Sequence, residues 1–294
     1  MSRTWTPGQG GLSYFFALNN TDKTILKLDL RQADQRDRLR ALITSADILV
    51  ENLRPGALAK LGFDRASLER INPQLIYCAI SGFGVESAYP DRPAFDTVIQ
   101  AMAGLMDLTR SNGDPVKLGV SAADILGGQA ALFALVSALA EGAPLKARFL
   151  EVAMQDVAAW SAIFAAGRPA PQGLKLACRD GFVWLDEQGL PAGSTPHAYP
   201  DCEALTRTEA IGRLATLGLR AVSVVRVDEL MQDADFLGDV LAAGTDENGG
   251  FWPLVKLPYR LNRTPGRVAA VAGVGPGDGA PAGPRGLPKG GSAA

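Results

Sequence analysis

Histidine is almost absent from this sequence: His197 is the single one among 294 residues. This excludes a zinc site built from several histidines of one chain, and a Ser-His-Asp triad would have to use His197. His197 lies in STPHAYP, which favours a solvated loop. The three cysteines are far apart and form no CxxC pair, so a disulfide framework and a cysteine-based metal site are not expected. The phosphate-binding pattern GxxxxGK[ST] is also missing.

No charge of either sign dominates, because 29 basic residues face 31 acidic ones and the net charge is −2. This balance predicts neither a nucleic-acid-binding protein nor a polybasic membrane binder. The first residues carry one arginine and no apolar core of a signal peptide. The longest apolar run, AALFALVSALA at 130–140, is too short to cross a bilayer. We therefore expect no membrane span and a cytoplasmic location.

Strand-like and helix-like segments alternate through the first half of the chain. Alternation of this kind predicts an α/β fold in which helices pack on a parallel sheet. We expect the 48–52 strand and the 121–142 helix to be buried, because both are apolar on nearly all sides. The predicted strands are 24–30, 48–52, 75–83 and 147–154, and the predicted helices are 33–47, 67–71, 95–109, 121–142 and 155–167.

The second half differs in composition and predicts a smaller α+β domain. Residues 174–188 resemble a hairpin that turns at Arg179-Asp180-Gly181. A helix at 202–218, a strand and short helices within 220–237, and a strand-like segment at 251–261 follow. Residues 271–294 are rich in glycine, proline and alanine, which is typical of disorder.

One acidic residue stands where a predicted strand meets a predicted helix, in EVAMQDVAAW (151–160). Asp156 suits the first turn of a helix, because its carboxylate complements the partial positive charge of that end. A carboxylate held there is also a candidate nucleophile. The residue type alone leaves both interpretations open.

Six motifs in one order carry a resemblance to a known family. The sequence resembles the class III CoA-transferases of the CaiB/BaiF type, which include formyl-CoA and carnitine CoA-transferases. The resemblance implies a Rossmann-like large domain, a small domain, two long connections between them, and two subunits that interlock as linked rings. The motifs are NNTDKTILKLDL, ADILVENLRPGALAKLGFD, INPQLIYCAISGFG, FDTVIQAMAGLM, VSAAD and VAMQDVAAW.

The resemblance also implies how the chain divides. Residues 1–167 would form the large domain as a partial Rossmann-like fold, and 168–242 the small domain. Residues 243–270, whose KLPYRLNRTPG is similar to the family's C-terminal return segment, would lead back to the large domain. The tail at 271–294 would follow.

The same resemblance implies a chemistry and its residues. An aspartate that matches Asp156 attacks the thioester of an acyl-CoA, forms a mixed anhydride, and then carries CoA as an aspartyl thioester. Asp96 matches an acidic position near the acyl group, where it would orient that group or relay a proton; a plain first-turn carboxylate is the alternative. Coenzyme A would be a substrate, with no permanently bound cofactor and no metal.

Three stretches match the family's CoA-binding segments. Asn52, Leu53 and Arg54 match a loop that contacts CoA, and a strand-end loop is where such sheets bind ligands. Lys23 matches the stretch that binds the nucleotide end, although NNTDKT has Asn20 where arginine is usual. The triplet Gly82, Phe83 and Gly84 matches a loop over the pantetheine. Solvated loops and a plain turn are the alternatives.

The sequence departs from the family pattern at several places. The strand and helix that begin the family are not found, and the glycine-rich loop over the aspartate has no clear counterpart. A fragment, a half that pairs with a second chain supplying those strands, and an inactive homologue are three explanations. A homodimeric transferase and a non-catalytic or partner-dependent CoA-binding subunit therefore both stay open. An acyl-CoA racemase, which is a relative of the family that uses a histidine and an aspartate, is less favoured. Asp124 matches its aspartate, but Phe95 stands where its histidine would be, so a structural role is expected for Asp124.

Overall fold

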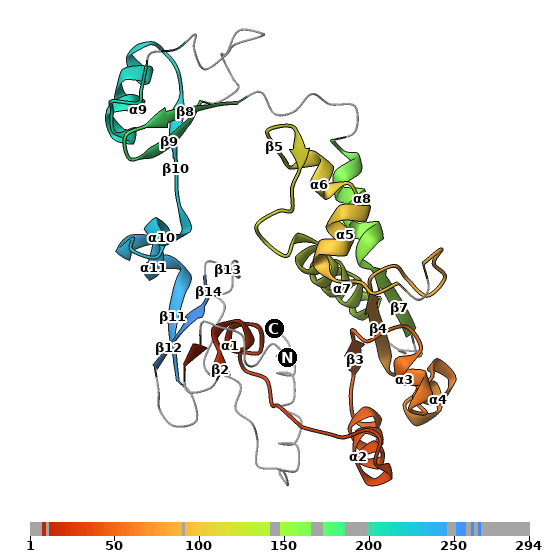
Figure 1. Cartoon of the computed structure of the whole chain (residues 1–294). Helices are drawn as coiled ribbons and strands as arrows, with labels where there is room; N and C mark the ends of the chain where they lie inside the picture. The colour runs from red at the N-terminus through yellow and green to blue at the C-terminus, as the bar shows by residue number, and fades with distance from the viewer. Residues whose placement is uncertain are drawn as a thin grey trace, which may run out of the picture. The chain divides into compact units, whose positions relative to one another are not determined.

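The structure is a computed structural model of the chain (Figure 1), and its contacts divide it into two compact units. One unit is Leu28–Gln172; the other joins Met1–Lys27 to Gly173–Ala294, so the first 27 residues group with the C-terminal half. The predicted boundary at 167 stays a prediction. His197, Gly167 and the tail 271–294 lie outside the described residues. The structure describes 8–9, 12–89, 92–141, 148–165, 173–185, 199, 201–245, 251–256, 260–261 and 264–265.

The unit Leu28–Gln172 contains a three-stranded parallel sheet in the order β3-β4-β7, which confirms the predicted α/β class. The strands are β3 (Ile48–Glu51), β4 (Ile76–Ser81) and β7 (Arg148–Ala153). The central strand β4 is largely buried. Burial of β3 was predicted wrongly, since Val50 is 50% exposed. The reason is position: β3 is an edge strand, so its apolar side chains lack a neighbour on one side.

Seven helices surround this sheet in the described residues of the unit. The predicted helix over 95–109 is divided, because Gly104 takes a left-handed conformation (φ 85°) between α5 and α6. The helices are α2 (Ala33–Thr44), α3 (Ala57–Lys60), α4 (Arg65–Ile71), α5 (Asp96–Met102), α6 (Leu105–Leu108), α7 (Ala122–Ala140) and α8 (Met154–Ile163), with a short hairpin of β5 (Arg110–Ser111) and β6 (Asp114–Pro115).

The predicted strand at 24–30 does not form, apart from an isolated bridge at Ile25. The segment crosses from one unit to the other between Lys27 and Leu28. Alternating apolar residues stabilise a strand only where a neighbouring strand takes up its backbone hydrogen bonds. Among the described residues no strand forms a ladder with this segment.

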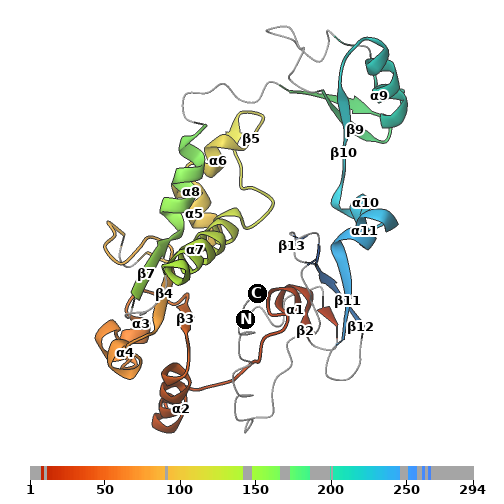
Figure 2. The same ribbon diagram turned by 180° about the vertical axis from the view of Figure 1, so that it is seen from behind.

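Helix α7 lies on the sheet with one face only. Small residues and Leu135 on that face pack with Ile76 and Cys78 of β4 and with Val152 of β7. The opposite face carries exposed Leu132 and Phe133, so the expectation that the whole helix is buried was wrong. By length and composition α7 could cross a membrane, although a single such helix is weak support because core helices pass the same test. Figure 2 shows α7 in front of the sheet.

A second core lies beyond the carboxyl ends of the strands, where Figure 1 shows α5, α6 and α8 together. It joins residues of the β4 loop, α5, α6, α7 and α8. A third core lies where α2, α3 and α4 pack near β3 and β4. The second core consists of Phe83, Ile99, Ala103, Leu105, Ala123, Met154 and Ala158, and the third of Ile43, Leu58, Phe63, Leu68 and Leu75.

The other unit has an antiparallel sheet in the order β10-β9-β8, which confirms the predicted hairpin. Helix α9 packs on it through Ala210 and Leu214. Tyr14 of α1 packs edge-on against Trp252 of β12, which ties the first residues to the C-terminal part. The elements are β1 (Gly8–Gln9), β2 (Leu12–Ser13), α1 (Tyr14–Asn19), β8 (Leu174–Cys178), β9 (Gly181–Leu185), α9 (Arg207–Thr216), β10 (Ala221–Val224), α10 (Val227–Leu230), α11 (Ala234–Val240), β11 (Leu241–Thr245), β12 (Phe251–Val255), β13 (Arg260–Leu261) and β14 (Thr264–Pro265).

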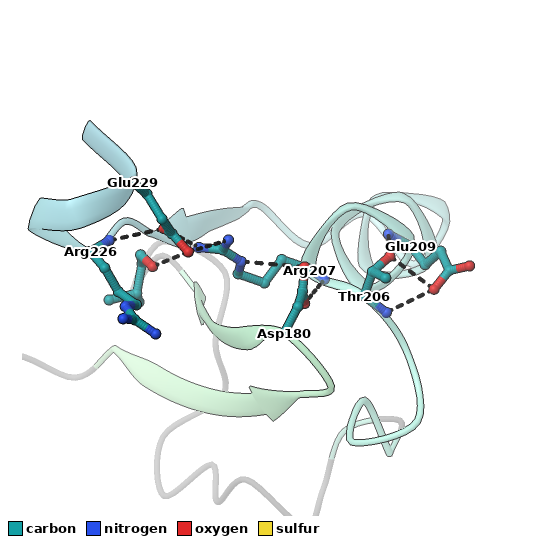
Figure 3. Close-up of polar contacts among 7 residues, drawn as sticks. Asp180, Thr206, Arg207, Glu209, Arg226 and Glu229 are labelled. Atoms are coloured by element: carbon teal, nitrogen blue, oxygen red, sulfur yellow. Dashed lines mark hydrogen bonds and ion pairs between the residues drawn. The ribbon is translucent and has the colours of Figure 1, made fainter. Parts of the chain in front are cut away.

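Arg207 joins three elements of this unit (Figure 3). Its guanidinium donates two hydrogen bonds to the Glu229 carboxylate, at 2.9 and 2.8 Å, and its backbone N–H donates to Asp180 at the hairpin turn. Thr206 and Glu209 form a capping box at the start of α9. The hydrogen bond from Arg207 lowers the pKa of Glu229. The network fixes α10 against the small sheet.

Candidate functional site

The carboxyl edge of the parallel sheet brings three predicted segments together. Asn52 follows β3, and its side-chain amide donates to the Ile80 carbonyl of β4 at 2.8 Å. Gly82 follows β4, and its carbonyl accepts from the Gln155 N–H at 2.9 Å. The start of α8 is therefore bonded to the loop after β4. Ligands of open α/β sheets bind at this edge.

Asp156 lies in the first turn of α8, two residues after the helix begins. Its side chain is exposed, and within the described residues its carboxylate makes no hydrogen bond or ion pair. Ala153 occupies the N-cap position, and its side chain cannot accept a hydrogen bond from the N–H groups of the first turn. The carboxylate thus stands open at a helix end of partial positive charge.

The Gly82–Gly84 loop cannot accommodate side chains at its two glycines. A Cβ on Gly82 would stand 1.9 Å from the Cβ of Ala94, and Gly84 has a φ of 88°. The Ser81 hydroxyl accepts from the Gly84 N–H at 2.9 Å, and the Glu151 carboxylate accepts from the N–H of Val85. Glycine is therefore required at both positions.

The predicted CoA-binding residues divide by environment. Leu53 and Arg54 are exposed at the end of β3, while Phe83 is buried in the core between α5 and α8. Phe83 thus packs the loop against this core. Lys23 belongs to the other unit, and its ammonium donates to the Asn19 carbonyl at 2.6 Å.

Asp96 lies at the start of α5 and is only 8% exposed. One carboxylate oxygen accepts from the Ala123 N–H of α7 at 2.9 Å, and the other accepts from the Gln100 side chain at 2.7 Å. Lys117 lies 3.4 Å from that second oxygen. Gln100 in turn accepts from the Leu118 N–H. The network ties the starts of α5 and α7 together, and these contacts support a structural role.

Asp124 lies in the first turn of α7, whose start borders that of α8 through the close approach of Gly127 to Met154. Although its side chain counts as exposed, desolvation and the nearby Asp96 carboxylate raise the pKa of Asp124. The starts of α5, α7 and α8 thus each carry a carboxylate.

A small hollow lies at the other end of the sheet, away from Asp156. It is lined by Arg65, Arg148 and Phe149 among others, near the first residues of β4 and β7. Arg148 pairs with Glu141 at 2.5 Å, and Arg65 lies over the Phe149 ring. These contacts occupy its cationic groups. Within the described ranges no cluster of three metal-ligating side chains is found.

Sequence reasoning missed the partners that hold this edge together. Gln100 could have been found, because it follows Asp96 by four residues on one helix face. Lys117, Ser81 and Glu151 gave no local signal, since their partners are distant in sequence or belong to a turn.

Comparison with known proteins decides the family. The sequence profile of CoA-transferase family III matches residues 1–172. The chain belongs to CoA-transferase family III. Two curated relatives are an acetyl-CoA:oxalate CoA-transferase of Acetobacter aceti, 37% identical, and a succinate–glutarate CoA-transferase of Agrobacterium fabrum, 34% identical. Each match covers 53% of this chain and 41% of the relative, so the chain spans less than half the length of these relatives.

Two solved structures are similar to this chain in fold. A CaiB/BaiF family protein from Brucella suis has a TM-score of 0.77 at 26% identity, covering 92% of this chain and 85% of that one. A hypothetical protein from Mycobacterium tuberculosis has a TM-score of 0.73 at 22% identity, covering 88% and 82%. The second likeness concerns the fold alone.

Proposed function

We propose that this family III chain moves CoA between an acyl-CoA thioester and a carboxylic acid, with Asp156 as nucleophile. One observation carries the proposal: the open carboxylate of Asp156 lies at the start of α8, which is bonded to the Gly82 loop at the ligand-binding edge of the sheet. Asp156 also lies within the segment that matches CoA-transferase family III, which supports a role in CoA transfer.

The proposed reaction consists of four successive displacements. An Asp156 oxygen attacks the thioester carbon, the C–S bond breaks, and CoA leaves as a thiolate from a mixed anhydride. The thiolate attacks the Asp156 carbonyl carbon and releases the donor acid, which leaves an aspartyl-CoA thioester. An acceptor carboxylate attacks that thioester, expels the thiolate and forms a second anhydride. Attack of the thiolate on the acceptor's carbonyl carbon then frees Asp156 and the new acyl-CoA.

The residues around Asp156 would divide the work. First-turn N–H groups of α8 are suited to stabilise the oxyanion that develops during each attack. The loops at Asn52–Arg54 and Gly82–Gly84 would hold CoA. The role of Lys23 at the nucleotide end stays a prediction. Asp96 would act mainly by holding α5 and α7 in place; orientation of the acyl group or a proton relay stays a prediction.

A second candidate is a partner-dependent CoA-binding subunit. The observation that favours it is the open edge of the sheet. β3 is an edge strand, which leaves one side of its backbone available for pairing. Parallel sheets are also usually covered on both faces, yet Val50 of β3 is half exposed. A second chain could supply further strands there. We propose a homodimer as the simpler assembly, and the cytoplasm as the location.

A transfer assay tests the function. Purified protein is incubated with an acyl-CoA donor and a panel of carboxylic acids, and new acyl-CoA is measured by mass spectrometry. Asp156→Ala is expected to abolish transfer. Asp34→Ala is the matched control, because Asp34 is an exposed carboxylate in the first turn of α2. Equal activity of Asp156→Ala and wild type would refute the proposal.

A further inference from the structure

The exposed face of α8 begins at Asp156 and continues as an apolar surface. Trp160, Ile163 and Phe164 follow Asp156 by four, seven and eight residues, a spacing that places side chains on one helix face. They are between 56% and 67% exposed, whereas Ala158 on the other face is fully buried. We call these three residues the Trp160 face.

The side chains of the Trp160 face form a contiguous surface. The Trp160 and Phe164 rings meet edge to face, with centroids 5.0 Å apart and an interplanar angle of 89°. Asp156 is the one charged residue of Met154–Ile163, so the surface is uncharged from there to the helix end. Contiguous exposed apolar surface of this kind commonly marks a binding site.

We infer that the Trp160 face binds the acyl group of the substrate, and that this group is an alkyl chain or an aromatic ring. The inference rests on the proposed role of Asp156. Residues four apart on a helix have Cβ atoms about 6 Å apart, so an acyl group joined to Asp156 reaches Trp160. The Gly82 loop borders the first turn of α8, where the CoA part is proposed to lie. The acyl group then extends along α8.

The charges of the described part of this unit favour an apolar acyl group over one with a second carboxylate. A distal carboxylate that lies against the apolar Trp160 face loses part of its hydration, which a cation or several hydrogen-bond donors would have to replace. Helix α8 supplies no lysine or arginine. Lys117 is paired with Asp96, and Arg92 lies over the Tyr89 ring. Arg110, which follows α6, is paired with Asp107, and Arg54 lies in the loop proposed to hold CoA. The substrate class that we infer for this chain is therefore not the one in the names of the relatives named for oxalate or glutarate.

Binding of unreactive thioethers tests the inference without requiring turnover. Titration calorimetry of the full chain would use S-methyl-CoA, S-hexyl-CoA and S-(3-carboxypropyl)-CoA. We expect S-hexyl-CoA to bind roughly tenfold more tightly than S-methyl-CoA, because its additional methylene groups are removed from water when they contact Trp160. S-(3-carboxypropyl)-CoA should bind no more tightly than S-methyl-CoA.

Variants assign the preference to the Trp160 face. Trp160→Ala is expected to remove the advantage of the hexyl group while leaving S-methyl-CoA binding unchanged, and Trp160→Phe should keep most of it. Phe133→Ala, which removes an exposed aromatic side chain from α7, should leave all three affinities unchanged.

The inference is overturned if none of the thioethers binds, if the carboxypropyl compound binds most tightly, or if Trp160→Ala keeps the hexyl preference. Failure of the proposed function is separate, because it is read from transfer and from Asp156→Ala. A chain that shows the Trp160-dependent preference but transfers no CoA would refute the catalytic proposal and keep the acyl-binding face.

Discussion

Replacing Asp96 by alanine is expected to lower the free energy of unfolding of the Leu28–Gln172 unit by about 3 kcal/mol. The change removes the acceptor for the Ala123 N–H and for one N–H of the Gln100 amide, and both residues are fully buried. The Gln100 amide keeps the Val120 carbonyl, 3.0 Å away, as a second acceptor, so the Ala123 N–H carries most of the loss. Each buried donor left without a partner costs about 1–3 kcal/mol. The Lys117 pair adds at most about 1 kcal/mol, because the lysine is partly exposed. Asp96→Asn keeps one acceptor oxygen and should lose about half as much.

Hydrogen exchange followed by mass spectrometry measures this effect where it arises. Peptides covering the first turn of α7 should lose protection in Asp96→Ala, together with a lower urea midpoint. Asp37→Ala is the control, because Asp37 is an exposed carboxylate 3.8 Å from Arg40 and its loss should change stability by less than about 0.5 kcal/mol.

Unchanged protection at Ala123 in Asp96→Ala would refute the structural role. Transfer by Asp96→Asn separates the two interpretations of this residue. A positioning carboxylate predicts that activity falls in step with protection of α7. Complete loss of transfer in a variant with normal protection would instead make Asp96 a catalytic group.

Two further changes test the loop and the small-sheet network. Gly82→Ala should destabilise the unit by about 1–3 kcal/mol through overpacking against Ala94, whereas Gly128→Ala, which meets open space, should not, as urea unfolding would show. Glu229→Gln should lower the melting temperature at pH 7. Because Arg207 lowers the pKa of Glu229, its stabilisation is present above the ordinary value of 4.5 and lost as pH falls through the lower folded value. The difference from wild type should therefore shrink in acid, and a pH-independent difference would contradict the ion pair.

Much of the fold follows from local patterns in the sequence. Alternating segments predicted the parallel sheet, and the turn at Arg179-Asp180-Gly181 predicted the β8–β9 hairpin. The 24–30 strand failed because a strand needs a neighbour, which no local pattern supplies. The burial of β3 and α7 failed for a related reason: an apolar segment does not reveal whether both of its sides are covered.

The site was predictable in part. Family motifs predicted Asp156 and the Gly82 loop as site residues, and the structure brings these two segments to one edge of the sheet. Motifs did not reveal that Phe83 is a core residue or that both oxygens of Asp96 are engaged. Those facts depend on contacts between α5, α7 and α8, which are distant in sequence.

Covalent labelling of Asp156 tests the central claim most directly. The full chain is incubated with acyl-CoA donors, with and without hydroxylamine, and the peptide that contains Asp156 is examined by mass spectrometry beside Asp156→Ala and Asp34→Ala. The account predicts a CoA adduct on that peptide, converted to a hydroxamate by hydroxylamine, in wild type and Asp34→Ala but not in Asp156→Ala. An adduct on another residue, or none from folded protein with any donor, would contradict it.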